Sequence, residues 1–90
     1  MEGDYKVPKG LAEKLAQEYS SEIMLYPESG TIDYDTTIDA FAERIMLDYS
    51  DDKIKRVFGQ PIDNTEWMAK WLIDYLPDLY EVLLKMNNEL

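Results

Sequence analysis

The chain contains neither cysteine nor histidine among its 90 residues. The absence of cysteine excludes a disulfide framework, a thiolate metal site and a cysteine nucleophile. The absence of histidine removes the usual general base near neutral pH, and the serines lie in no sequence pattern that activates a hydroxyl. Hydrolysis by two carboxylates needs a cleft that a domain this small can hardly enclose. We therefore predict no catalytic residue, no metal site, no cofactor and no enzymatic activity.

Basic residues are scarce, since 9 lysines and arginines stand against 19 aspartates and glutamates, for a formal net charge of −10 at pH 7. This charge repels phosphate groups and therefore disfavours direct binding of nucleic acid or of an anionic membrane surface. The same charge attracts a basic surface. We expect a basic protein partner, with no direct contact to nucleic acid or membrane.

Long apolar runs are also missing. Uninterrupted apolar stretches are only a few residues long, whereas a membrane-spanning helix needs about 20 residues. The N-terminal stretch MEGDYKVPKG carries acidic residues where a signal peptide carries positive charge, and no apolar stretch follows it. We expect a soluble protein in the cytoplasm.

The length and composition favour one folded unit. Hydrophobic residues make up 46% of the chain and charged residues 31%, which is enough apolar surface for a core despite the net charge. A chain of 90 residues fits one domain, so we predict a single helical domain over residues 1–90. Domains of this size are marginally stable, and formation of a homodimer would add to their stability.

Apolar residues at spacings of three and four predict a first helix that begins at Pro8 and that Pro27 brings to an end by Tyr26 at the latest. The stretch 23–34 is ambiguous, because Pro27 and Gly30 have turn chemistry between apolar neighbours. We favour an ordered loop there. The alternative is a short hairpin, which would make the fold α+β.

A second amphipathic pattern follows, and Thr36 or Thr37 is its predicted N-cap. Its apolar residues gather on one face of a helix, while Leu47 falls on the opposite side. Ser50 or Asp51 is then the predicted cap of a short third helix.

The last element opens at Asn64 or Thr65. Its helical phase continues unchanged across Pro77, so we predict one helix over residues 64–88 that is kinked at this proline. A break of about one turn is the alternative.

The apolar arc in the first half of this element includes Trp67 and Trp71 and is wider than one neighbouring helix can cover. Large apolar residues at helical spacing usually lie inside, so we expect the arc in the middle of the bundle; the alternative is that part of it faces a partner. Together the elements predict an all-α fold, a small bundle of four to five helices with a long C-terminal helix kinked at Pro77.

Acidic residues concentrate between positions 33 and 52, where Arg44 is the only basic residue. Asp39 and Glu43 are four residues apart and therefore adjacent on a helix, where like charges destabilise the folded state slightly. A field of spaced carboxylates can imitate the phosphate row of a nucleic acid and occupy a basic groove. The alternative is that these carboxylates only keep the protein soluble. The candidate partner-binding residues are Asp33, Asp35, Asp39, Glu43, Asp48, Asp51 and Asp52.

Two other patterns are incomplete. Asp33, Asp35 and Asp39 have the outline of half a calcium loop, but Ile38 and Arg44 stand where the loop needs glycine and glutamate. Residues in the stretch SDDKIKRVFGQPIDNTEWMAKWL have the outline of a helix-turn-helix, yet its second helix opens with an acid and no arginine to contact bases or phosphates. We expect a solvated acidic loop and a plain helix pair.

The leading hypothesis is a non-catalytic acidic module that binds a basic protein. Its sharpest form is an inhibitor that acts as a nucleic-acid mimic in the basic groove of a nucleic-acid-handling protein, as phages use against host defences. The alternative is a structural or adaptor module that associates through apolar surface, as a homodimer or with a partner helix. We recognise no family motif in the sequence.

Overall fold

The computed structural model describes residues 6–89, and this part of the chain contains five α-helices and one short 3₁₀ helix. The elements are α1 (Leu11–Glu18), the 3₁₀ helix η1 (Ser20–Glu22), α2 (Tyr34–Asp48), α3 (Asp51–Phe58), α4 (Thr65–Tyr75) and α5 (Leu79–Glu89). No strand occurs between residues 6 and 89. The predicted all-α bundle of four to five helices is confirmed.

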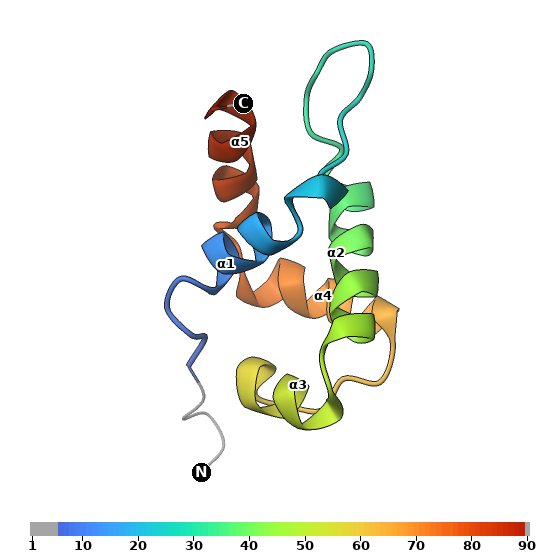
Figure 1. The fold of residues 1–90 in the computed structure, drawn as a ribbon, viewed down its shortest axis with the longest axis vertical. Coiled ribbons are helices and arrows are strands. Elements are labelled where there is room, and N and C mark those ends of the chain that lie inside the picture. The colour runs from blue at the N-terminus through green and yellow to red at the C-terminus, as the bar shows by residue number, and fades with distance from the viewer. Residues whose placement is uncertain (1–5, 90) are drawn as a thin grey trace.

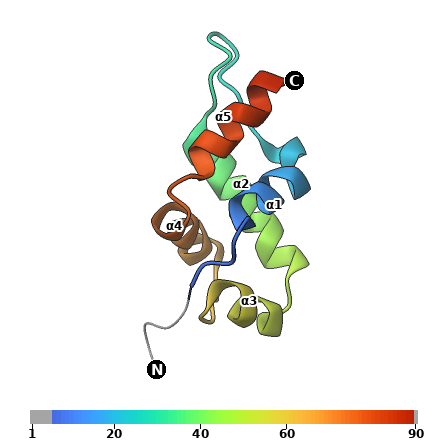
Figure 2. The same cartoon turned by 90° about the vertical axis from the view of Figure 1, so that its left-hand side faces the viewer.

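Two helix pairs make the body of the molecule, because α4 packs against α2 and α1 packs against α5. In Figure 1, α2 runs vertically, α4 crosses the middle of the molecule, and α3 lies at the lower end. The loop between η1 and α2 projects at the upper end (Figure 1). The view turned by 90° shows α5 running obliquely toward the same end (Figure 2).

The first helix is shorter than the sequence pattern predicted. It ends at Glu18, and the chain turns through η1 before Ile23 becomes extended. Tyr19 is 3% exposed and its hydroxyl donates a hydrogen bond of 2.9 Å to Asp48 on α2. This contact between Tyr19 and α2 lies just beyond the end of the helix, which therefore stops well before Tyr26, the latest end that the sequence allowed.

The stretch between η1 and α2 is an ordered loop, as favoured from the sequence. Its two sides meet at one antiparallel bridge between Leu25 and Ile32, and no strand forms within it. The backbone N–H of Tyr26 bonds to the Thr31 carbonyl at 2.8 Å. Gly30 has a φ of 71°, a conformation that other residues rarely adopt, and its N–H bonds to the Tyr26 carbonyl. These bonds fix the course of the loop.

The second helix begins earlier than predicted. Asp33 is its N-cap and accepts hydrogen bonds from the backbone N–H and the hydroxyl of Thr36, so the prediction of Thr36 or Thr37 as the cap was wrong. Thr37 is fully buried and bonds through its hydroxyl to the backbone of Met24, which ties the base of the loop to α2. Aspartate is as good a cap as threonine. The Thr37 hydroxyl bonds to the loop and therefore does not cap the helix.

The caps predicted for the next two helices are confirmed. The Ser50 side chain accepts a hydrogen bond from the Lys53 N–H at the start of α3, and Asn64 accepts one from the Trp67 N–H at the start of α4. Gly59 closes α3 with a φ of 78°. These short polar side chains satisfy N–H groups that would otherwise have no partner in the first turn.

The predicted single C-terminal helix is two helices. α4 ends at Tyr75 and α5 begins at Leu79, so the chain has a break of about one turn around Pro77, the alternative that the sequence left open. Proline has no N–H to bond the Ile73 carbonyl, and it disfavours the helical conformation at Leu76, whose φ and ψ are −121° and 65°. The apolar residues of α4 and α5 share one helical phase because both helices bury residues in the same core.

The core is one cluster with residues from every α-helix. Trp71 lies inside it at 3% exposure, its indole N–H donates to the Phe58 carbonyl at 3.1 Å, and its ring meets the Phe58 ring edge-on at 4.6 Å. Trp67, one turn earlier on α4, is 58% exposed. The wide apolar arc is therefore divided between the core and the surface.

Candidate binding surface

The structure separates the seven predicted acidic residues into three groups. Asp33 and Asp48 make hydrogen bonds that support the fold. Asp35, Asp39 and Glu43 lie exposed along α2, and Asp51 and Asp52 lie exposed in the first turn of α3. The second and third groups are exposed and are the candidates for contact with a partner.

Asp35, Asp39 and Glu43 form an outward row on α2. They are spaced by four residues, which places successive carboxylates on one side of the helix at intervals of about 6 Å along its axis. Within residues 6–89, none of the three makes an ion pair with a lysine or an arginine. Leu47 continues the row by one more turn and is 81% exposed. The row is therefore an unneutralised acidic ridge that ends in an exposed apolar residue.

Arg44, the only basic residue of α2, lies on the side of the helix that faces α1. Its guanidinium is 3.8 Å from the carboxylate of Glu22 and 4.0 Å from that of Asp48, and its Cζ lies 5.9 Å from the centre of the Tyr19 ring. The positive charge is thus held near η1 and Tyr19. Arg44 forms no ion pair with a carboxylate of the outward row.

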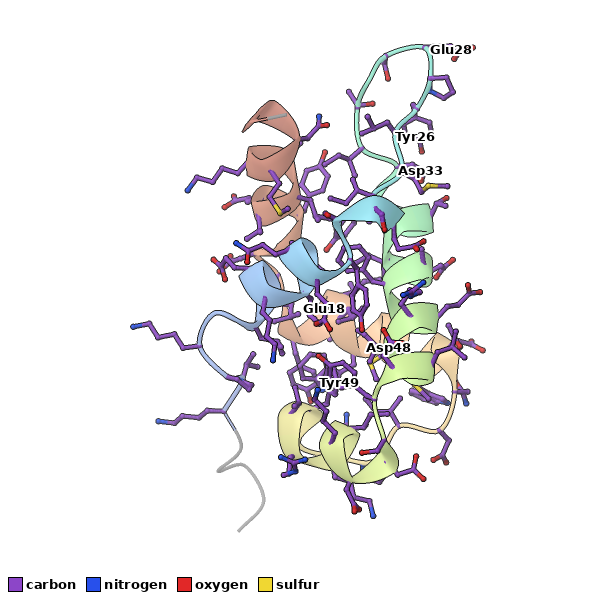
Figure 3. The ribbon with its side chains drawn as sticks, in the orientation of Figure 1. Glu18, Tyr26, Glu28, Asp33, Asp48 and Tyr49 are labelled. Carbon is purple, nitrogen blue, oxygen red and sulfur yellow. The ribbon has the colours of Figure 1, made fainter. Side chains whose placement is uncertain are left out.

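Asp48 has a structural role that the sequence did not reveal. Figure 3 shows it with Glu18 and Tyr49 between α1 and the C-terminal end of α2. It accepts the Tyr19 hydroxyl and neighbours Arg44, and these contacts offset the cost of an acid at the negative end of the α2 dipole. Substitution of Asp48 would disturb the fold as well as the surface charge, which makes it unsuitable for a test of binding.

Two tyrosines in this region give a matched prediction for stability. Tyr19 bonds to Asp48, whereas the buried hydroxyl of Tyr49 has no hydrogen-bond partner among the described residues. Tyr19→Phe should lower the free energy of unfolding by about 1 kcal/mol, and Tyr49→Phe should raise it by about 1 kcal/mol, because only the second change removes an unpaired buried group. Urea unfolding followed by circular dichroism measures both. A larger loss for Tyr49→Phe than for Tyr19→Phe would contradict the assignment.

The same two side chains predict a loss of stability at high pH. Burial, the hydrogen bond to Asp48 and the charge of Glu18 raise the pKa of Tyr19, and burial with the charges of Glu18 and Asp48 raises the pKa of Tyr49. The unfolded chain releases these protons near pH 10 while the folded chain retains them, so the free energy of unfolding should fall as pH rises above about 10. Urea unfolding midpoints between pH 8 and pH 11.5 measure how steeply the stability falls with pH. This slope should be shallower in Tyr19→Phe. An identical slope in that variant would show that Tyr19 makes no contribution.

A tyrosine-lined pocket lies at the N-terminal end of the outward row, and the sequence did not indicate it. Its lining consists of Tyr26 and Ile32 from the loop, Tyr34 and Asp35 from α2, and Tyr80 from α5. The Tyr34 and Tyr80 rings meet edge-on with their centres 5.0 Å apart. Tyr26 lies on the loop above Asp33 in Figure 3. No periodicity links residues so far apart in the chain, so only the fold brings these tyrosines together.

The structure of residues 6–89 bears on metal binding and on insertion into a membrane. This part of the chain holds no group of three acidic residues arranged to bind a metal ion. It also holds no helix with the length and hydropathy required to cross a membrane.

Comparison with known proteins gives no assignment. No protein-family model matches the chain, and neither the curated proteins nor the solved structures yield a match.

Proposed function

We propose that the chain is a non-catalytic module that binds a basic protein through the outward row of α2, with the exposed Asp51 and Asp52 of α3 as further acidic contacts. The supporting observation is the unequal distribution of charge on α2, where Arg44 pairs with Glu22 and Asp48, while no lysine or arginine of residues 6–89 forms an ion pair with the row. Asp39 and Glu43 are adjacent like charges, which weaken a helix by a small amount, so their spacing does not stabilise the fold. The row favours capture of a positively charged surface, because long-range attraction accelerates association.

The finer form of the proposal is inhibition of a nucleic-acid-handling protein by occupation of its basic groove. The row repeats one sign of charge about every 6 Å, whereas each strand of a DNA duplex carries one charge per about 3.4 Å of axis. The lower density implies that charge alone matches such a groove incompletely. Leu47, which continues the row, can add apolar contact.

Affinity capture tests the proposal. The tagged chain is incubated with a lysate of its source cells, or of their host, and washed at about 0.05 M and about 1 M salt before mass spectrometry. Because the screening length falls to about 3 Å at 1 M salt, a basic protein held by the row should be retained at low salt and lost at high salt. A partner of acidic or neutral surface, or one retained equally in both washes, would contradict electrostatic capture.

A second candidate function rests on exposed apolar side chains. Trp67, at 58% exposure, and Ile73, at 48%, lie on α4 outside the core. Exposed tryptophan is enriched at the energetic centres of interfaces, which favours an adaptor that pairs with another helix or with a second copy of the chain. Sedimentation velocity from about 10 µM to about 1 mM tests the homodimer, as dimerisation through exposed apolar side chains should persist in about 1 M salt. A monomer throughout that range would exclude the homodimer.

A further inference from the structure

The tyrosine-lined pocket combines two groups that attract cations. Three tyrosine rings and one carboxylate line it, and no lysine or arginine of the described range does so. Tyr26 is 50% exposed and Tyr80 is 39% exposed, so both rings are open to a ligand from solvent. The face of an aromatic ring carries partial negative charge and attracts an ammonium or guanidinium group, and a carboxylate beside it adds a charge-assisted hydrogen bond.

The protein already uses this combination elsewhere in its own fold. Arg44 lies 5.9 Å from the centre of the Tyr19 ring and within 4.0 Å of the carboxylates of Glu22 and Asp48. That arrangement places a guanidinium beside one tyrosine and two acids, the same kinds of side chain that line the pocket. The pocket offers rings and an acid at the surface, and a cation has to come from outside the described residues.

The pocket is held by the fold. Ile32, one of its lining residues, is 4% exposed, and the N–H of Asp33 bonds to the Met24 carbonyl at 2.9 Å where the two sides of the loop meet. The edge-on contact between Tyr34 and Tyr80 holds these two rings against each other. Two rings held in this way lose little side-chain entropy when a ligand binds, which favours even a small cationic group.

We propose that the tyrosine-lined pocket binds the guanidinium of an arginine side chain on the basic partner. Arginine fits better than lysine, because its planar group stacks on aromatic faces and bonds a carboxylate through two N–H groups at once. The inference rests on the proposed function and adds to it an anchoring residue on the partner. Asp35 belongs both to the pocket and to the outward row, so one arginine in the pocket would direct the neighbouring basic residues of the partner along Asp39 and Glu43.

The test uses three peptides of identical length, acetyl-GRGRG-amide, acetyl-GKGKG-amide and a version with citrulline, which keeps the shape of arginine without its charge. Each is titrated into the full-length chain, and the ring resonances of Tyr26 and Tyr80 are followed by NMR. The arginine peptide should shift both sets of resonances in a saturable manner and bind at least threefold more tightly than the lysine peptide. The citrulline peptide should cause no saturable shift. Equal affinity for arginine and citrulline, or no shift with arginine at about 10 mM, would overturn the proposal.

Variants with unchanged net charge locate the site. Tyr26→Leu combined with Tyr80→Leu keeps apolar bulk but removes two ring faces, and should weaken the arginine peptide about tenfold and abolish its advantage over lysine. Tyr75→Leu is the matched control, since Tyr75 is an exposed tyrosine that lines no part of this pocket, and it should leave the affinity unchanged. The circular dichroism spectrum of each variant establishes that it is folded. Wild-type affinity in the folded double variant would overturn the proposal.

The variant Asp39→Lys/Glu43→Lys separates this inference from the proposed function. If the row binds cations and the pocket does not, arginine and lysine peptides bind equally and both weaken in this variant, which overturns the pocket alone. If the preference for arginine persists in the variant and depends on Tyr26 and Tyr80, the pocket stands even where the row fails.

Discussion

Trp71→Ala should lower the free energy of unfolding by about 3–5 kcal/mol, whereas Trp67→Ala should change it by less than about 0.5 kcal/mol. The two residues have the same chemistry and lie one turn apart on α4, but Trp71 is 3% exposed and Trp67 is 58% exposed. Loss of the Trp71 indole empties the space beside Phe58 and leaves the Phe58 carbonyl without its donor. Urea unfolding monitored by circular dichroism compares the two variants.

The expected loss in Trp71→Ala is a large share of the total stability, which for 90 residues is on the order of 5–13 kcal/mol. Trp71→Phe is therefore the second variant, since it keeps an aromatic ring in the core and removes only the N–H and part of the bulk. Its loss should lie between those of the two alanine variants. Equal losses for Trp67→Ala and Trp71→Ala would contradict the division of the tryptophans between surface and core.

Asp39→Lys combined with Glu43→Lys should weaken binding of the basic partner by about 10- to 100-fold. Both side chains are exposed on the outward row, so the change turns two attractive contacts into repulsive ones and slows association. Each reversal changes the charge by +2, so the net charge moves from −10 to −6. The affinity for the captured partner is measured by calorimetry at about 0.1 M salt.

A control with the same net charge distinguishes the row from the overall charge. Asp63→Lys combined with Asp74→Lys also gives −6 from −10, and both side chains are exposed and belong to segments other than α2. Asp74 pairs with Lys70 only at 3.7 Å on the surface, where such pairs contribute little to stability. This variant should retain most of the affinity. An equal loss in both double variants would mean that the net charge, and not the row, attracts the partner.

Local signals predicted much of the fold. Apolar periodicity gave the all-α class, and the polar residues Ser50 and Asn64 capped the helices they were expected to cap. These features depend on neighbours within a few residues of each other, which a sequence displays directly.

The wrong predictions about the fold are explained by contacts between distant parts of the chain. Thr37 is a good cap by its chemistry, yet its hydroxyl bonds to Met24 across the loop, and Asp33 caps α2 in its place. The helical phase continued across Pro77 because α4 and α5 bury residues in one core, although the chain between them is not helical. Periodicity reports which side of a segment is buried, and it does not report whether the helix is continuous.

The candidate surface was predictable only in part. Spacing placed Asp39 and Glu43 on one side of a helix, and the structure has them exposed there. The role of Asp48 could not be read from the sequence, because its partner Tyr19 is 29 residues away in the chain. The tyrosine-lined pocket could not be predicted either, because its residues are also far apart in the chain.

Labelling of individual carboxylates tests most directly whether the outward row is the contact surface. The chain is treated with a water-soluble carbodiimide and glycine ethyl ester at low conversion, alone and in complex with the captured partner, and the rate at each acid is read by mass spectrometry. Asp39 and Glu43 should react severalfold more slowly in the complex, while Asp63 and Asp74 should react at the same rate. Unchanged rates at Asp39 and Glu43, with the partner demonstrably bound, would contradict the account.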